Sequence, residues 1–221
     1  MPPDELLLAC DAVLFDSDGV LVDSHVQVVA CWTRLAAEFG LDIDLLLTEL
    51  VGVRAVDTLG RYLAGDRLAA ACDRLEDLEV ETAGGTVPIA GAAELLGALP
   101  DGRWTIVTSA TRRLGTARWQ GAGLPVPERL VTADDVTAGK PDPQPFLAAA
   151  RVLGVEPARC VVFEDSASGG RAAVAAGAAV VAVGQQPWPF EPAARVPDLR
   201  SVCVVPGAGD GTGVTLAVAI G

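Results

Sequence analysis

Ala12-Val13-Leu14-Phe15-Asp16-Ser17-Asp18-Gly19-Val20 is the stretch of sequence that decides the fold. It begins as an apolar run rich in strand-forming residues and ends in two aspartates two positions apart, followed by a glycine. Open α/β sheets bind their ligands at the carboxyl ends of the parallel strands. A buried strand over residues 12–15 would therefore deliver two carboxylates to that edge, where they suit a magnesium ion and a nucleophilic carboxylate.

The composition fits a globular α/β protein with a sizeable core. Of the 221 residues, 51% are hydrophobic and only 5% are aromatic. The formal net charge is −13, which argues against nucleic acid or an anionic membrane as a partner, because both require a basic surface. The same charge is compatible with a small phosphorylated metabolite, since a bound metal can invert the local field. Charged residues or proline interrupt every apolar run before it could span a bilayer, so we expect no membrane association.

The cysteines and the N-terminal residues indicate a cytoplasmic protein. Residues 1–10 contain acidic residues and no basic segment, which is not the pattern of a secretory signal. The cysteines are odd in number and contain no CxxC pair, so we expect reduced thiols in place of disulfides or a zinc site. They are Cys10, Cys31, Cys72, Cys160 and Cys203.

The chain contains a single lysine, Lys140, while every other cationic side chain except His25 is an arginine. Arginine is a broad planar fork, whereas lysine is a compact point charge on a slim stem. The use of lysine at one position in an arginine-rich chain therefore indicates a narrow site that requires a point charge.

The spacing of apolar residues divides the chain into a helical insert and a series of strand–helix units. Residues 23–83 keep a helical pattern with no strand between them, and after Gly84-Gly85 and Pro88 strands alternate with helices. Strands are predicted at 12–15, 104–108, 130–131, 160–163 and 179–183, with a further candidate at 202–205; helices are predicted at 112–120, 142–153 and 166–176. The pattern predicts an α/β fold with a doubly wound parallel sheet and a small all-helical cap inserted after the first strand. We expect a core formed by residues 1–22 and 87–221, and a cap formed by residues 23–86.

Four polar clusters lie just past predicted strands or in the loops between them. Because parallel strands end at one edge of a sheet, these clusters are expected to converge. The clusters are Asp16 with Asp18, Thr108 with Ser109, Lys140 with Pro141, and Glu164 with Asp165.

With these motifs the chain resembles the haloacid dehalogenase superfamily of phosphotransferases, in the group that carries a helical cap after the first strand. The resemblance extends from about Asp11 to Val205. The four motifs are Phe15-Asp16-Ser17-Asp18-Gly19, Val107-Thr108-Ser109-Ala110, Gly139-Lys140-Pro141-Asp142-Pro143 and Phe163-Glu164-Asp165-Ser166, in that order.

The resemblance implies a role for each motif residue. Asp16 would be the nucleophile that forms an aspartyl-phosphate, and Asp18 would be the general acid and then the general base, with its backbone carbonyl on the metal. Ser109 and Ala110 would bind the phosphoryl group at the start of a helix, where free N–H groups favour anions. The alternative for both aspartates is a turn after the strand, and the alternative for Ser109 is an ordinary helix cap, a role that Thr108 or Thr111 could also fill.

The other two motifs would neutralise charge and complete a magnesium site. Lys140 would neutralise the nucleophile and the phosphoryl oxygens, and its alternative is a solvated surface lysine. Glu164 and Asp165 would bind Mg²⁺ together with Asp16 and the Asp18 carbonyl. The alternative for Glu164 and Asp165 is a favourable interaction with the positive end of the following helix, which Glu164 can make in addition.

Substrate choice is expected to lie in the cap. Gly52-Val53-Arg54-Ala55-Val56-Asp57 resembles the cap segment of 2-deoxyglucose-6-phosphate and glycerol-3-phosphate phosphatases. Arg54 is a candidate ligand for the substrate, with a surface ion pair as the alternative. His25 is a second candidate, although a histidine near a helix start is commonly a cap or a partly buried polar group.

We therefore predict a magnesium-dependent phosphatase of a small phosphorylated sugar or polyol, acting as a monomer or weak dimer. One alternative is a phosphomutase of the β-phosphoglucomutase type, which carries a histidine further along the first cap helix, where this chain has Val28. Another is a binding or regulatory protein that has the fold but no turnover. A phosphonate-cleaving relative would need a cap lysine, which this chain lacks, and a receiver domain would lack the helical insert and the second aspartate.

Overall fold

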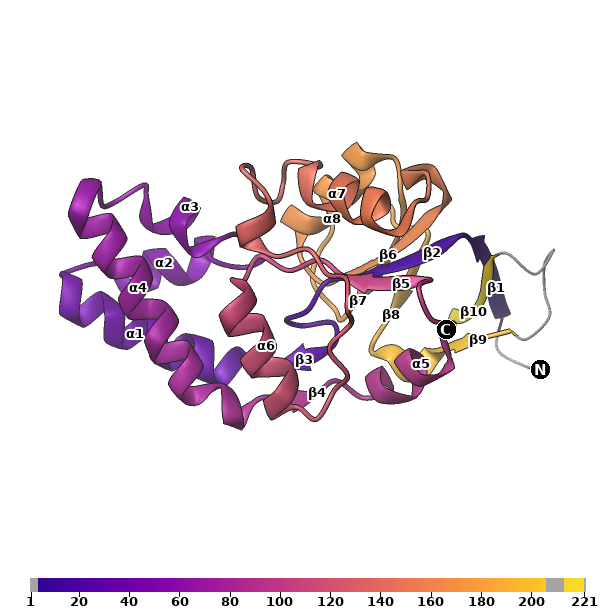
Figure 1. Ribbon diagram of the computed structural model, residues 1–221, viewed down its shortest axis with the longest axis horizontal. Coiled ribbons are helices and arrows are strands. Elements are labelled where there is room, and N and C mark those ends of the chain that lie inside the picture. Colours follow the sequence, from indigo (N-terminus) through magenta and orange to yellow (C-terminus); the bar gives the residue numbers. More distant parts are fainter. Residues whose placement is uncertain (1–3, 206–212, 221) are drawn as a thin grey trace.

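The computed structural model describes residues 4–205 and 213–220, and a five-stranded parallel sheet lies at its centre (Figure 1). The strands lie in the order β5-β2-β6-β7-β8, and the isolated bridge between Val107 and Val131 extends the sheet beyond β5. The bounds are β2 (Ala12–Phe15), β5 (Trp104–Ile106), β6 (Cys160–Glu164), β7 (Ala179–Val183) and β8 (Ala194–Val196). The predicted α/β fold with a doubly wound parallel sheet is confirmed.

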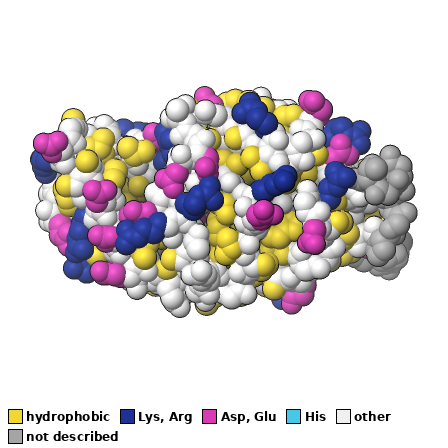
Figure 2. Space-filling model, viewed as in Figure 1, with side chains coloured by type: hydrophobic (Ala, Val, Ile, Leu, Met, Phe, Trp, Pro, Cys, Tyr) yellow, Lys and Arg dark blue, Asp and Glu magenta, His cyan; other side chains and the backbone are white. Residues whose placement is uncertain are grey.

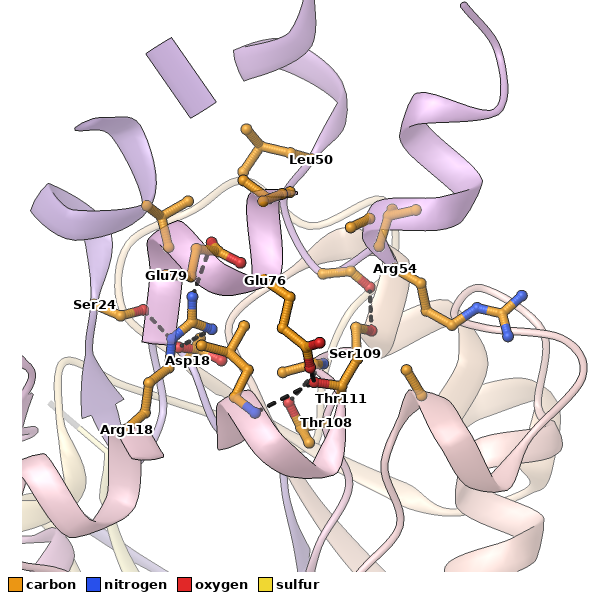
Figure 3. A pocket seen from close by; sticks show the side chains of 18 of the residues that line it. Asp18, Ser24, Leu50, Arg54, Glu76, Glu79, Thr108, Ser109, Thr111 and Arg118 are labelled. Carbon is orange, nitrogen blue, oxygen red and sulfur yellow. Dashed lines mark hydrogen bonds and ion pairs between the residues drawn. The ribbon is translucent and has the colours of Figure 1, made fainter. Parts of the chain in front are cut away.

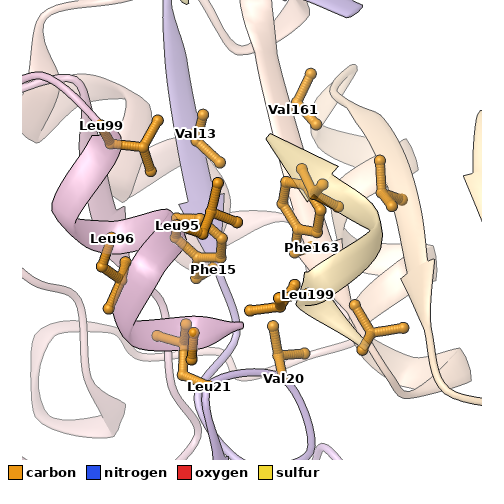
Figure 4. Close-up of a cluster of buried hydrophobic side chains, with 14 of the residues drawn as sticks. Val13, Phe15, Val20, Leu21, Leu95, Leu96, Leu99, Val161, Phe163 and Leu199 are labelled. Atoms are coloured by element: carbon orange, nitrogen blue, oxygen red, sulfur yellow. The ribbon is translucent and has the colours of Figure 1, made fainter. Parts of the chain in front are cut away.

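Helices and loops cover both faces of this sheet, because each central strand is apolar on both sides. In β2, Val13 and Phe15 point to the face covered by α5 (Ala92–Ala98), where Phe15 stacks on Phe163 (Figure 4). Ala12 and Leu14 point to the opposite face, which α7 (Gln144–Leu153) and α8 (Ala167–Ala176) cover. The two faces fix β2 in register, so that Asp16 emerges at the carboxyl edge.

The residues between β2 and β5 include four helices with a core of their own. They are α1 (His25–Phe39), α2 (Ile43–Glu49), α3 (Ala55–Leu59) and α4 (Gly65–Thr82). Apolar side chains from all four helices meet inside this unit, among them Trp32, Leu46, Leu59 and Leu75. The helical insert expected from the sequence is therefore present, at the left of Figure 1.

Two short strands form the connections between the insert and the sheet. β3 (Val22–Asp23) and β4 (Val87–Pro88) pair antiparallel, with Val22 opposite Pro88. The chain therefore enters and leaves the insert side by side, through one narrow ribbon.

A second sheet lies at the other end of the molecule, at the right of Figure 1. It contains β1 (Asp4–Cys10), β10 (Val214–Ile220) and β9 (Val202–Val204), all antiparallel, in the order β1-β10-β9. The strand candidate at 202–205 thus exists but belongs to this second sheet, and β1 and β10 were not predicted. Because β1 precedes β2, the insert follows the first strand of the parallel sheet and the second strand of the chain.

The remaining helices are short or lie beside the insert. α6 (Arg112–Gly121) follows β5 and packs against α4. The 3₁₀ turns are η1 (Ala83–Gly85), η2 (Ala133–Asp135), η3 (Pro157–Arg159) and η4 (Leu199–Ser201).

Candidate active site

The four polar clusters meet at the carboxyl edge of the parallel sheet. Asp16 follows β2, Glu164 ends β6, and Lys140 reaches both from the loop before α7. The Lys140 Nζ lies 2.5 Å from Asp16 Oδ1 and 2.8 Å from Glu164 Oε1. All three side chains are buried, with exposed fractions of 2% for Lys140, 5% for Asp16 and 0% for Glu164. Lys140 is thus a buried point charge between two carboxylates and not a solvated surface lysine.

This buried cluster has more negative than positive groups. The carboxylates of Asp16, Glu164 and Asp165 offer oxygens that all lie within 4.8 Å of one another, against the single ammonium group of Lys140. Burial and the neighbouring Glu164 raise the pKa of Asp16 to about 7 although Lys140 acts in the opposite direction. The same two causes hold the pKa of Asp165 well above its usual range. Burial acts to lower the pKa of Lys140, but the carboxylates outweigh it and the pKa is raised.

Such a set of oxygen donors fits a hard divalent cation. Mg²⁺ is bound in proteins by one or two carboxylates and retains several other oxygen ligands, and here its charge would offset the excess of negative groups. Asp16 and Asp165 are the better placed donors. Glu164 Oε2 already accepts the backbone N–H groups of Asp165 (2.7 Å) and Ser166 (2.9 Å), while Oε1 accepts the Lys140 ammonium.

The loop after β2 requires a glycine where it passes the third carboxylate. Gly19 has a φ of +84°, and a Cβ placed there would lie 2.0 Å from Asp165 Oδ2. The backbone can therefore approach Asp165 only because position 19 has no side chain. Ser17 holds the other side of this loop, since its Oγ accepts the Trp119 Nε1–H at 2.9 Å in the buried interior.

Asp18 lies at the mouth of the site, and two donors hold one of its oxygens. Ser24 Oγ donates to Asp18 Oδ1 at 2.5 Å, and Arg118 Nη1 lies 3.0 Å from the same oxygen. Arg118 also pairs with Glu79 of α4 at 3.0 Å. Sequence reasoning missed both Arg118 and Glu79. A signal was present for Arg118, which stands four positions after the apolar Leu114 and beside Trp119, on the buried side of its helix.

Ser109 contacts the insert, and another residue caps the helix that follows. Ser109 Oγ donates to the carbonyl of Gly52 at 3.1 Å. The N-cap of α6 is Thr111, whose hydroxyl accepts the N–H of Leu114 at 3.2 Å. Ser109 is therefore not the cap of α6. It lines the cavity together with Thr108 and Ala110, shortly after β5, and its role in binding a phosphoryl group stays a prediction.

A cavity of about 430 Å³ opens between the insert and the sheet edge (Figure 3), within the usual range for small-molecule sites. Asp16, Asp18, Ser109 and Asp165 line its floor and α4 contributes Asp73, Glu76 and Glu79.

The two predicted cap ligands both line this cavity. The guanidinium of Arg54 is committed to Asp57, at 2.7 and 2.9 Å, and to the carbonyls of Val136 and Thr137 on the core. His25 is the first residue of α1, and its side chain is exposed. Contact of Arg54 or His25 with the substrate stays a prediction.

Figure 2 shows how charged side chains are distributed on one face of the molecule. On the face drawn in Figure 2, arginine and acidic side chains are interspersed and no basic patch gathers among the residues shown. Within residues 4–205 and 213–220, no helix combines the length and the apolar character needed to cross a membrane.

Comparison with known proteins gives a consistent result. The family model for haloacid dehalogenase-like hydrolases matches residues 10–177. Hexitol phosphatase A of Escherichia coli (strain K12) is 39% identical over 181 residues, which cover 80% of this chain and 84% of that protein. Glycerol-1-phosphate phosphohydrolase 2 of Saccharomyces cerevisiae is 30% identical over 194 residues, covering 80% and 76%. The crystal structure of a hydrolase from Pseudomonas syringae shares the fold with a TM-score of 0.74, at 24% identity and with 85% and 94% covered.

Proposed function

The chain belongs to the haloacid dehalogenase-like hydrolases and is a phosphoric monoester hydrolase, and we propose that it hydrolyses the phosphate ester of a small sugar or polyol through an aspartyl-phosphate on Asp16. The observation that carries this proposal is the buried contact of Asp16 with Lys140, near Asp165, beside a cavity whose lining includes several hydroxyl and carboxylate side chains among apolar ones. Hydroxyl-rich substrates suit such a lining, because each carboxylate oxygen can accept a hydroxyl proton.

In the first step, a carboxylate oxygen of Asp16 attacks phosphorus and the bond from phosphorus to the ester oxygen breaks. Asp18 donates its proton to the leaving alkoxide, so that a neutral alcohol departs. Lys140 neutralises charge on Asp16 and on the phosphoryl oxygens, and Ser109 donates a hydrogen bond to the phosphoryl group.

In the second step, water attacks phosphorus and the bond from phosphorus to Asp16 breaks. Asp18, now ionised, accepts the proton of that water, and inorganic phosphate and the original carboxylate are regenerated. Mg²⁺ held by Asp16, Asp165, the Asp18 carbonyl and Glu164 would lower the charge on the phosphoryl oxygens throughout.

The helical insert is proposed to select the substrate. We assign residues 23–86 to this cap and residues 1–22 and 87–221 to the core. The cap residues that line the cavity include Asp73, Glu76 and Glu79, and on the core side Thr111 donates a hydrogen bond to Glu76. We also propose that the protein is cytoplasmic and that it is a monomer or a weak dimer.

The charges of the cavity favour hydrolysis of a monophosphate over the phosphomutase alternative. A mutase of this type must hold a second phosphate group away from the nucleophile. Among the described residues that line the cavity, the cationic candidates are His25, Arg54 and Arg118, and both arginines are already paired with carboxylates. A second phosphate would therefore meet an acidic lining with no uncommitted arginine.

Phosphate release from a panel of sugar and polyol phosphates and p-nitrophenyl phosphate tests the proposal. The panel is run with Mg²⁺, with EDTA, and with Asp16→Asn as the control variant. We expect release that requires Mg²⁺ and is lost in the variant. Isomerisation of a sugar phosphate primed with a bisphosphate, without net release, would favour the mutase, and no reaction in either assay would favour a binding protein.

A further inference from the structure

The acid–base residue of the proposed reaction is Asp18, and two donors from different parts of the chain contact its carboxyl oxygen Oδ1. Asp18 Oδ1 accepts from Ser24 Oγ at 2.5 Å and lies 3.0 Å from Arg118 Nη1. The Ser24 hydroxyl and the nearest guanidinium nitrogen of Arg118 thus both contact the same carboxyl oxygen. Two fixed donors at one oxygen restrict the orientation of the carboxyl group that must carry and release the proton.

Arg118 is an unusual residue to find in this position. It lies on α6 of the core, is only 6% exposed, and has carboxylates on both sides, since Nη2 donates to Glu79 Oε1 at 3.0 Å. Burying an ion pair costs desolvation that the attraction between the charges barely offsets, so such a pair is weak evidence for a role in stability alone. A guanidinium can, however, hold two partners at once in a fixed geometry.

The second partner of Arg118 comes from the insert. Glu79 belongs to α4, is 7% exposed, and also accepts a hydrogen bond from Trp32 of α1. Figure 3 shows the guanidinium of Arg118 between Glu79 and Asp18 at one side of the cavity. The contacts therefore form one continuous row from the insert, through a core helix, to the acid–base residue.

We propose that Arg118 is a positioning residue for Asp18, and that Glu79 holds Arg118 in the required orientation when the insert is docked on the core. The inference rests on the proposed function and deepens it. Docking of α4 then does more than close the cavity, because it also completes the support of the residue that must transfer the proton. If the insert moved away from the core, Arg118 would lose its contact with Glu79 and would hold the Asp18 carboxylate less firmly in position.

Two substrates with different leaving groups separate this role from others. An alkyl phosphate such as glycerol phosphate needs a proton on its leaving oxygen, whereas p-nitrophenolate leaves without one. The first turnover of p-nitrophenyl phosphate, seen as a burst of p-nitrophenolate, therefore reports on Asp16, Lys140 and the metal but little on the placement of Asp18. Steady-state turnover of the alkyl ester depends on Asp18 in both steps.

The test compares Arg118→Met and Glu79→Gln with Arg113→Met. Arg113 is a matched control, because it lies on the same helix and pairs with Asp77 of α4 across the same interface, but it is exposed and does not touch Asp18. We expect Arg118→Met to lower kcat for the alkyl phosphate by about 10²-fold, the typical cost of a misplaced catalytic group, with KM little changed and the burst rate retained. Glu79→Gln should give a smaller loss of the same kind, and Arg113→Met none.

Three results would overturn the inference. The first is an unchanged kcat in Arg118→Met. The second is an effect mainly on KM, which would make Arg118 a substrate ligand. The third is loss of the burst together with turnover, which would make Arg118 a support of the whole site. A retained burst shows in the same sample that the variant is folded. Failure of the wild-type protein to release phosphate from either ester would overturn the proposed function itself.

Discussion

Asp16 shares a buried site with two other carboxylates and one ammonium group, and this imbalance determines how the protein responds to pH and to metal. The pKa of Asp16 is raised to about 7, above its ordinary value of 3.8. Between these two values the folded protein keeps a proton that the unfolded chain has released. Stability therefore falls as the pH rises through this window, and the ionised site is stable mainly when a cation balances it.

The first prediction concerns Asp16→Asn in the absence of metal. The amide of the variant carries no charge at any pH. The variant therefore does not lose the folding stability that the wild type loses as Asp16 ionises between about pH 4 and 7. In EDTA the variant should be more stable than the wild type at pH 8 by about 1–4 kcal/mol, and the difference should shrink towards pH 4. Denaturant unfolding across this range measures it. Saturating Mg²⁺ should narrow the gap at pH 8, and a difference that is constant with pH would contradict the account.

The sequence predicts a site residue when a signal lies in the residue itself or in its immediate neighbours. Asp16 follows a strand that could be recognised, and Lys140 was noticed because the chain has one lysine. Arg118 and Glu79 could not be found in this way. A charged residue on a helix is usually a solvated one, and only the packing of α4 on α6 buries both side chains and pairs them.

At the scale of elements, the loop after β2 lies against the residue that follows the neighbouring strand β6. Gly19 lets this loop lie against Asp165, which follows β6. Because β2 and β6 are neighbours in the parallel sheet, Phe15 pairs with Phe163 and the two carboxyl ends are aligned. The β2–β6 pairing therefore brings Asp16 and Asp165 to the same edge, and the loop passes close beside Asp165.

The second prediction compares Gly19→Ala with Gly40→Ala. Both glycines have positive φ, so both alanine variants should lose about 1–2 kcal/mol of stability. A Cβ at position 40 meets open space, whereas one at position 19 would collide with Asp165. Only Gly19→Ala should therefore require a higher Mg²⁺ concentration, both for activity and for the rise in Tm that Mg²⁺ produces. An unchanged Mg²⁺ requirement in Gly19→Ala would show that the contact has no role in the metal site.

The strands differ in how readily the sequence predicts them. β2, β6 and β7 are apolar on both faces and bounded by polar residues, so they were predicted within one residue at each end. β1 and β10 were missed. Each finds its partner at the opposite end of the chain, with Asp4 opposite Ile220, and nothing in a local pattern indicates that pairing. The short predicted strand at 130–131 is only a bridge to Val107.

For the whole molecule, the central feature is the way in which the insert is attached. The polypeptide connects the insert to the core only through the β3–β4 ribbon. Separate hydrogen bonds hold the insert over the site. Arg54 donates to the carbonyls of Val136 and Thr137, and Ser109 donates to the carbonyl of Gly52. These docking contacts are hydrogen bonds, which can be exchanged for hydrogen bonds to water. We therefore expect the insert to open and close about the ribbon during turnover, as lids over active sites do.

The third prediction tests this motion with a crosslink. Arg113 and Asp77 form an exposed ion pair between α6 and α4, so cysteines at both positions can be joined by a short, reducible linker. Cys72 and Cys203 are replaced by serine in the background, since these two cysteines are not buried. Joining the insert to the core should lower turnover sharply, and reduction of the linker should restore it. Turnover that is unaffected by the linker would refute the hinge.

If Asp16 carries the phosphoryl group during turnover, this covalent intermediate can be trapped on Asp16 and located. In Asp18→Asn, p-nitrophenyl phosphate should still phosphorylate Asp16, because its leaving group needs no proton, while attack by water is slowed by about 10²–10⁴-fold. Acid quenching followed by tandem mass spectrometry then locates the modification. We expect one phosphoryl group on Asp16 in the presence of Mg²⁺, and none with EDTA or when Asp16 is replaced by asparagine. Turnover of the wild-type protein with no phosphorylated Asp16 in this variant, or with the phosphoryl group on another residue, would contradict this expectation.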